Sequence, residues 1–197
     1  MDYYAGDLHL GHRKVIDFDN RPFNDVEDMN LQIINNINKV VGKDDTLTFV
    51  GDISFTLKPE ELRNLILKIK CKNLILIKGN HDDLIFRRFH LFENIFKEIH
   101  EMKIIKDNKV YVTICHYPLL SWKGMYHGGI NVYAHVHTND ESIVTKERPR
   151  PNAYNAGIMF HNYMPVTLNQ MKETFGYNKH YYDKKRFTNE IKNNITL

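Results

Sequence analysis

A short polar stretch, Gly79-Asn80-His81-Asp82, follows an apolar run at residues 73–77 and carries three groups that can do chemistry. The apolar run is short enough to be a buried strand and too short for a helix. After the turn that glycine permits, Asn80 offers an amide oxygen for a metal ion, His81 an imidazole that can carry a proton, and Asp82 a carboxylate that can orient the imidazole. The alternative is an ordinary turn in which Asp82 caps the helix that follows.

Similar side chains stand at other points where an apolar, strand-like run ends. Residues two apart in extended backbone point the same way, so two donors separated by one residue converge on one point. Together with Asn80, the side chains collected in this way are Asp7, His9, Asp52, His116, His135 and His137. In α/β proteins, functional sites form outside the carboxyl ends of the strands, which is where these residues fall.

The collected donors are carboxylates, imidazoles and an amide oxygen, with no thiolate among them. This set suits Mn, Fe or Zn in a catalytic site better than a structural zinc. There are too many donors for one tetrahedral ion, and their number suits two ions that share one carboxylate. Two ions about 3.5–4 Å apart acidify a bridging water and hold the oxygens of a phosphoryl group during in-line attack. His81, beside Asn80, is placed to protonate the leaving group.

The elements expected between these side chains alternate between strand and helix over the first half of the chain. Strands are predicted at residues 1–5, 46–50 and 73–77, and a helix at about 25–41 begins with a capping box formed by Asn24 and Glu27. A second helix starts near Pro59. The second half predicts strands at 98–105, 109–115, 130–134, 152–157 and 158–161, a hairpin turn at 106–108 and a helix at 168–175. The pattern indicates an α/β fold with a parallel or mixed sheet.

The composition is that of a globular chain, since 42% of its 197 residues are hydrophobic and 26% are charged. We expect one domain at residues 1–175 with a basic C-terminal extension at 176–197, which supplies the whole net charge of +3. The rest of the chain is formally neutral, so nucleic acid is expected only as a substrate. No apolar run approaches the roughly 18 residues of a membrane helix, and the N-terminus has no signal-peptide pattern. With two cysteines, the chain is predicted to be cytoplasmic.

Taken together and in order, the motifs resemble the calcineurin-like metallophosphoesterase superfamily. They are Asp7-x-His9, Gly51-Asp52, Gly79-Asn80-His81-Asp82, His116 and His135-x-His137, and Arg21-Pro22-Phe23 is similar to a group of small bacterial and phage phosphoesterases. The resemblance spans about residues 1–172. It implies a four-layer α/β sandwich in which two mixed sheets pack face to face with helices outside.

The resemblance also implies a role for each residue of the motifs. One divalent ion would be held by Asp7, His9, Asp52 and His137, and the second by Asp52, Asn80, His116 and His135. Asp52 would bridge the two ions, of which Mn is favoured over Fe, Zn or Ni. His81 would assist the leaving group, with Asp82 as its orienting partner.

Two departures from the family pattern bear on function. The last motif usually has glycine before its first histidine, and here it has Ala134, which is acceptable if the backbone there avoids positive φ. The Asp-Arg-Gly of protein phosphatases is also missing, because Asp52 is followed by Ile53. This disfavours a Ser/Thr phosphatase. Residues that would replace the missing arginine in binding substrate are His12, Arg13 and Arg21.

The function predicted is hydrolysis of a phosphate ester by a dinuclear metal centre with a bridging hydroxide. A phosphodiester is favoured, because the arginine that grips a dianionic monoester is not evident. The alternatives are a non-catalytic binding scaffold of the same fold and a nuclease, which would need a basic groove. Trp122 and Tyr126 would either line a substrate cleft or anchor their own loop, and the second reading is favoured.

Overall fold

The computed structural model describes residues 1–55, 57–137 and 152–179 of the chain. Most of the predicted basic extension at 176–197 therefore lies outside the described residues. The division into a domain at 1–175 and an extension stays a prediction.

The first sheet has the strand order β4-β3-β2-β1-β9. Its strands are β1 (Asp2–Ala5), β2 (Thr46–Val50), β3 (Asn73–Ile77), β4 (Phe96–His100) and β9 (Val166–Thr167). Strands β1 to β4 pair in parallel, and β9 is antiparallel to β1. The carboxyl ends of β1, β2 and β3 consequently share one edge of a mixed sheet, as the sequence predicted.

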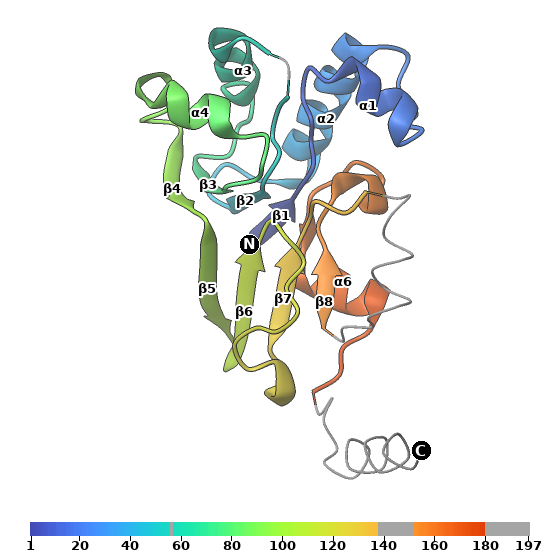
Figure 1. The fold of residues 1–197 in the computed structure, drawn as a ribbon, viewed down its shortest axis with the longest axis vertical. Helices are drawn as coiled ribbons and strands as arrows, with labels where there is room; N and C mark the ends of the chain where they lie inside the picture. The colour runs from blue at the N-terminus through green and yellow to red at the C-terminus, as the bar shows by residue number, and fades with distance from the viewer. Residues whose placement is uncertain (56, 138–151, 180–197) are drawn as a thin grey trace, which may run out of the picture.

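Helices cover the outer face of this sheet (Figure 1). They are α1 (Arg13–Phe18), α2 (Val26–Val40), α3 (Pro59–Ile66) and α4 (Asp83–Arg87), followed by a 3₁₀ helix, η1 (Phe89–Leu91). Met29, Ile33 and Ile37 of α2 lie in one core with Leu47 and Phe49 of β2. The spacing of four between the α2 residues places them on one side of the helix, which explains why this helix packs on the sheet.

The start of α2 differs by one residue from the predicted start. Asp25 is the N-cap, and its carboxylate accepts the backbone N–H of Asp28 at 2.8 Å. Asn24 instead donates its own backbone N–H and its side-chain amide to the Asp28 carboxylate. The capping box predicted from Asn24 and Glu27 is wrong, because both the cap and the acidic residue lie one position further along the chain.

The second sheet has the order β5-β6-β7-β8 and is also mixed. Its strands are β5 (Met102–Asp107), β6 (Val110–Cys115), β7 (Ile130–Tyr133) and β8 (Ala153–Asn155). The predicted hairpin is confirmed between β5 and β6, where Asn108 and Lys109 have φ of 45° and 71° and form a two-residue turn. Between β6 and β7 lies a 3₁₀ helix, η2 (Met125–His127), and the predicted helix near the end is α6 (Leu168–Phe175).

The two sheets pack face to face. Tyr4, Val50 and Ile77 of the first sheet share a buried core with Val112 and Val132 of the second. Leu168 and Met171 of α6 join this core, and α6 contacts β8, β9 and β1. The layers are thus helices, sheet, sheet and helix, which confirms the four-layer sandwich with two mixed sheets.

Two predicted strands are wrong in detail. Residues 98–105 were expected to be one strand, but β4 ends at His100 in the first sheet and β5 begins at Met102 in the second. Residues 158–161 form a 3₁₀ helix, η3 (Ile158–His161), in which the N–H of Phe160 donates to the carbonyl of Gly157 at 3.0 Å. Both errors arise because local β-propensity does not reveal which sheet, if any, a segment joins.

Backbone hydrogen bonds draw the loops after the strands together. The N–H of Asp7 donates to the backbone carbonyl of Gly51 at 3.1 Å, and the N–H of His9 donates to the backbone carbonyl of Asp52 at 3.0 Å. Between the sheets, the N–H of Gly6 donates to Ala156 at 2.8 Å. The segments that follow β1, β2 and β8 therefore meet at one place.

Candidate metal centre

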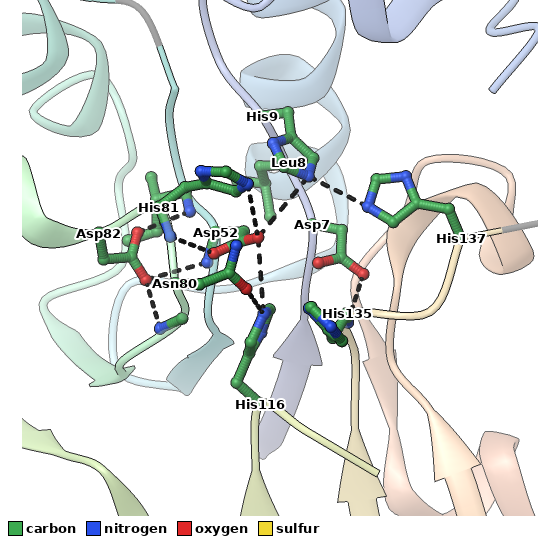
Figure 2. A network of polar contacts seen from close by, with 12 residues as sticks. Asp7, Leu8, His9, Asp52, Asn80, His81, Asp82, His116, His135 and His137 are labelled. Atoms are coloured by element: carbon green, nitrogen blue, oxygen red, sulfur yellow. Dashed lines mark hydrogen bonds and ion pairs between the residues drawn. The ribbon is translucent and has the colours of Figure 1, made fainter. Parts of the chain in front are cut away.

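Asp7, His9 and His137 form the first group of donors (Figure 2). Asp7 and His9 follow β1 and are buried, while His137 follows β7 and is partly exposed. One ligand atom from each residue lies within 4.8 Å of the others, and the Nε2 atoms of His9 and His137 are 3.2 Å apart. Residues separated in sequence by more than a hundred positions thus direct their donor atoms to one point.

Asp52, His116 and His135 form the second group, again with ligand atoms within 4.8 Å of one another. Asp52 follows β2, His116 follows β6 and His135 follows β7. The Asn80 amide oxygen lies 3.1 Å from Nε2 of His116, so the amide from the turn after β3 faces this group (Figure 2).

The Asp52 carboxylate lies between the two groups. Its Oδ2 is 3.5 Å from Nε2 of His116 and 3.9 Å from Nε2 of His9. A single carboxylate oxygen therefore faces an imidazole of each group, and the seven side chains expected from the sequence are brought to one place.

Two of the donors, His9 and Asp52, are held in the protonation states that bind metal ions. Burial lowers the pKa of His9 to about 3, so its imidazole is neutral at pH 7. Burial would raise the pKa of Asp52, but the hydrogen bond and charge of His116 outweigh it and hold this pKa at about 2. A neutral imidazole and an ionised carboxylate are the forms that bind metal ions.

Asp7 shows that the first group suits a cation. Its Oδ1 is buried with no hydrogen-bond partner in the described part of the chain, and burial raises the pKa of the Asp7 carboxyl to about 6. An unpartnered buried carboxylate oxygen is costly unless a cation compensates it. Two nitrogens that each lie about 2.0–2.1 Å from a common ion are roughly 3.0–3.4 Å apart, and the His9 to His137 separation of 3.2 Å falls in this range. The residues present therefore fit a divalent ion.

Several candidate ligands adopt backbone conformations that non-glycine residues rarely take. Asp7, His9, Asp52 and His135 have φ of 54°, 52°, 55° and 73°. Each such residue costs of order 1–3 kcal/mol and persists where the surroundings enforce it, most often at functional sites. The left-handed backbone turns each side chain toward the centre instead of letting the strand continue.

Comparison with known proteins agrees with this geometry. A family model described as calcineurin-like phosphoesterase matches residues 3–193. The chain belongs to the calcineurin-like phosphoesterase family.

Individual relatives of the chain extend the comparison. An uncharacterized protein of Methanocaldococcus jannaschii is 28% identical over 166 residues, which cover 84% of this chain and 86% of that protein. The Gene 66 protein of Mycobacterium phage L5 is 33% identical over 81 residues, covering 41% of this chain and 39% of its own length. The crystal structure of a protein of unknown function from Aquifex aeolicus matches with a TM-score of 0.69 and 23% identity, covering 88% of this chain and 98% of that one. This last likeness shows the fold.

In this phosphoesterase, His81 lies at the edge of the centre. Its backbone N–H donates to Oδ1 of Asp52 at 2.9 Å, and its Nε2 is 4.0 Å from Oδ2 of the same residue. The side chain is 34% exposed, so the imidazole can reach a bound molecule. His81 is thus held beside the donors, and it does not belong to either donor group.

Asp82 does not orient the His81 ring, contrary to the prediction. Its buried carboxylate accepts backbone N–H groups from Asp52 at 2.9 Å, Ile53 at 2.9 Å and Gly79 at 2.8 Å. These bonds join the turns after β2 and β3. The prediction failed because a carboxylate surrounded by three backbone donors is directed away from the neighbouring imidazole.

The predicted substrate contact at Arg21 is wrong, because its guanidinium is fully buried. Nη1 donates to the carbonyl of Leu8 at 2.9 Å and Nη2 to the carbonyl of Asp7 at 3.0 Å. The structure does not bring Arg13 to the centre either: its side chain is 57% exposed and pairs with Asp17 on the surface of α1 at 3.1 Å. Neither arginine replaces the phosphate-binding arginine of protein phosphatases.

His12 does lie at the centre, beside an aromatic rim. The centroid of the His12 ring is 5.7 Å from that of the His9 ring and 4.4 Å from that of the Phe55 ring. Phe55 in turn contacts the His81 ring at 4.5 Å, and on the other side Tyr117 lies 4.8 Å from the ring of His135. Phe55 and Tyr117 are each nearly half exposed, and sequence reasoning assigned neither to the site.

Trp122 anchors its loop, as expected, because its indole N–H donates to the carbonyl of Gly129 at 2.9 Å. Ala134, in place of the usual glycine, is accommodated without positive φ. Its methyl group lies where Gly6 leaves room, since a Cβ at Gly6 would be 2.5 Å away. Within the described residues, no helix is both long and apolar enough to cross a membrane.

Proposed function

We propose that this phosphoesterase hydrolyses a phosphodiester with two divalent ions held at the centre. The observation that carries the proposal is the position of the Asp52 carboxylate, which faces an imidazole of each donor group. One ion would be held by Asp7, His9, Asp52 and His137, and the other by Asp52, Asn80, His116 and His135. The absence of thiolates among these donors favours Mn over a structural zinc.

Two ions bound there would supply an acidified bridging water as the nucleophile and neutralise the phosphoryl oxygens. His81 supports the departure of the leaving group, because its partly exposed imidazole stands beside Asp52 and outside both donor groups. Asp82 keeps the turns that carry Asp52 and Asn80 in a fixed relation.

The contacts made by Arg21 and Arg13 support a preference for a diester. Arg21 uses its guanidinium on carbonyl groups, and Arg13 pairs with Asp17 at the surface. Neither of these two arginines is therefore available to grip a monoester dianion, whereas a diester carries one negative charge and a second organic group. The exposed rings of Phe55 and Tyr117 beside the centre suit that second group. A cytoplasmic location, and nucleic acid only as a substrate, stay predictions.

The test is an assay of metal-stripped protein with added Mn²⁺ against bis-p-nitrophenyl phosphate and p-nitrophenyl phosphate. We expect turnover that depends on the metal and is faster for the diester. Asp52→Ala is the matched negative control, because it removes the shared carboxylate. The absence of turnover of both esters with Mn, Fe, Zn and Ni would overturn the proposal.

A further inference from the structure

Arg21 contacts the centre indirectly, through the backbone of the segment that carries Asp7 and His9. Its guanidinium is fully buried and bonds the carbonyl oxygens of Asp7 and Leu8 at 3.0 and 2.9 Å. These two carbonyls lie within the segment in which Asp7 and His9 have positive φ. Because two left-handed non-glycine residues separated by a single residue are unfavourable, the fork of the guanidinium supplies the contacts that hold them in place.

Asp19 connects this arginine to the third donor of the same group. Its carboxylate accepts Nε and Nη2 of Arg21 at 3.1 and 2.9 Å. The same carboxylate faces Nδ1 of His137, with its two oxygens at 2.8 and 2.9 Å. Only 2% of the Asp19 side chain is exposed, so water does not compete for these bonds. When Nδ1 of His137 donates to Asp19, its Nε2 is left to face Nε2 of His9 at 3.2 Å.

We infer that the buried Asp19–Arg21 ion pair is the positioning element for one ion of the proposed centre and not for the other. It holds the backbone of Asp7 and His9 through Arg21 and the imidazole of His137 through Asp19. The inference rests on the proposed metal-dependent function.

In the second donor group, His116 and Asp52 are held by contacts that involve neither Asp19 nor Arg21, whereas His135 is linked to the first group because its backbone N–H donates to Oδ2 of Asp7 at 2.9 Å. Nδ1 of His116 lies 2.8 Å from the carbonyl oxygen of Val50, and the turn carrying Asp52 is held by Asp82. A change at Asp19 therefore leaves these contacts in place. The two ions should respond separately to substitution.

The experiment is a titration of metal-stripped protein with Mn²⁺, in which binding is measured by calorimetry and by electron paramagnetic resonance. Wild type should bind two ions and, when loaded, give the spectrum of a spin-coupled pair. Asp19→Asn removes the charge that orients His137. We expect one ion to bind with wild-type affinity and the other about 10- to 100-fold more weakly, so that the spectrum at two equivalents is that of isolated Mn²⁺.

The matched control is Asp17→Asn, which makes the same chemical change on a 69% exposed side chain of α1 and should leave both affinities unchanged. Arg21→Lys is a second variant, because a lysine cannot bond two carbonyls and Asp19 with a planar fork. It should weaken the same ion. Wild-type affinity for both ions in Asp19→Asn, or equal weakening of both, would overturn the inference.

A measurement on wild-type protein replaces the variants if they fail to fold. With Zn²⁺ bound, nitrogen-detected NMR should show a slowly exchanging proton on Nδ1 of His137, and its absence would overturn the inference.

The outcomes distinguish failure of the proposed function from failure of the positioning role. Loss of one ion in Asp19→Asn with no ester turnover by wild type would overturn the proposed function alone, and turnover by wild type with both ions retained in Asp19→Asn would overturn the positioning role alone.

Discussion

The carboxylate of Asp82 accepts the backbone N–H of Asp52 at 2.9 Å. Because the same carboxylate also accepts N–H groups of Gly79 and Ile53, it ties the turn after β3 to the turn after β2. Asp82 therefore acts on the backbone that carries two candidate ligands and not on the ring of His81. Asp82 and His81 are neighbours in sequence, which suggests that the two side chains act together. The contact that Asp82 makes is instead with Asp52, thirty positions away.

Asp82→Asn should destabilise the metal-free protein by about 1–3 kcal/mol, measured by urea unfolding. An amide has only one acceptor oxygen, so its NH₂ group must face at least one of the three backbone N–H donors. Asp83→Asn is the control, since Asp83 is adjacent and its side chain is 57% exposed. Equal stability of the two variants would show that the three bonds do not hold the turns.

Gly6→Ala should destabilise the protein because its new Cβ would lie 2.5 Å from the Cβ of Ala134. Overpacking of this kind costs about 1–3 kcal/mol. Adding Ala134→Gly should restore most of the loss, which a double-mutant cycle of urea unfolding energies will measure. Additive effects of the two substitutions would mean that the contact between these positions is not the cause.

The stability of the metal-free protein should depend on pH through Asp7. Its folded-state pKa is raised to about 6 from an ordinary value of 3.8. The native state thus binds this proton more tightly than the unfolded state, so the stabilisation is complete below about pH 3.8 and is lost as pH rises through about 6. Urea unfolding at pH 5, 6 and 7 should show wild type gaining stability toward pH 5 relative to Asp7→Asn, by at most about 1.4 kcal/mol per pH unit. An identical pH dependence of the two proteins would contradict the raised pKa.

The sequence predicted the donors of the centre because their signal is local. An apolar run followed by Asp, Asn or His marks a strand end, and parallel strands bring such ends to one edge. All seven donors, including Asp52, were found in this way and lie together. The elements around them followed from periodicity, as the helix at Leu168–Phe175 shows.

The parts that sequence reasoning missed depend on contacts between distant segments. Nothing in the residues around Asp19 indicates that its carboxylate meets His137, 118 positions away. The prediction of a substrate contact at Arg21 is wrong because the carbonyl groups that accept its guanidinium hydrogen bonds come into place only in the folded backbone. The crossing at Glu101 was missed for the same reason, since strand propensity continues while the chain changes sheets.

His81→Ala should retain both metal ions and lose turnover in proportion to the basicity of the leaving group. The imidazole lies outside both donor groups, so metal binding does not depend on it. A general acid typically contributes about 10²–10⁴-fold, and it matters least when the leaving group is already acidic. Rates for a series of phosphodiesters from p-nitrophenyl to alkyl should therefore fall more steeply in His81→Ala than in wild type. His90→Ala is the control, because His90 is exposed on η1. The contribution of a proton donor to the rate depends on how strongly the departing oxygen needs a proton. A uniform loss of rate across the series, or loss of metal, would therefore assign His81 to another role.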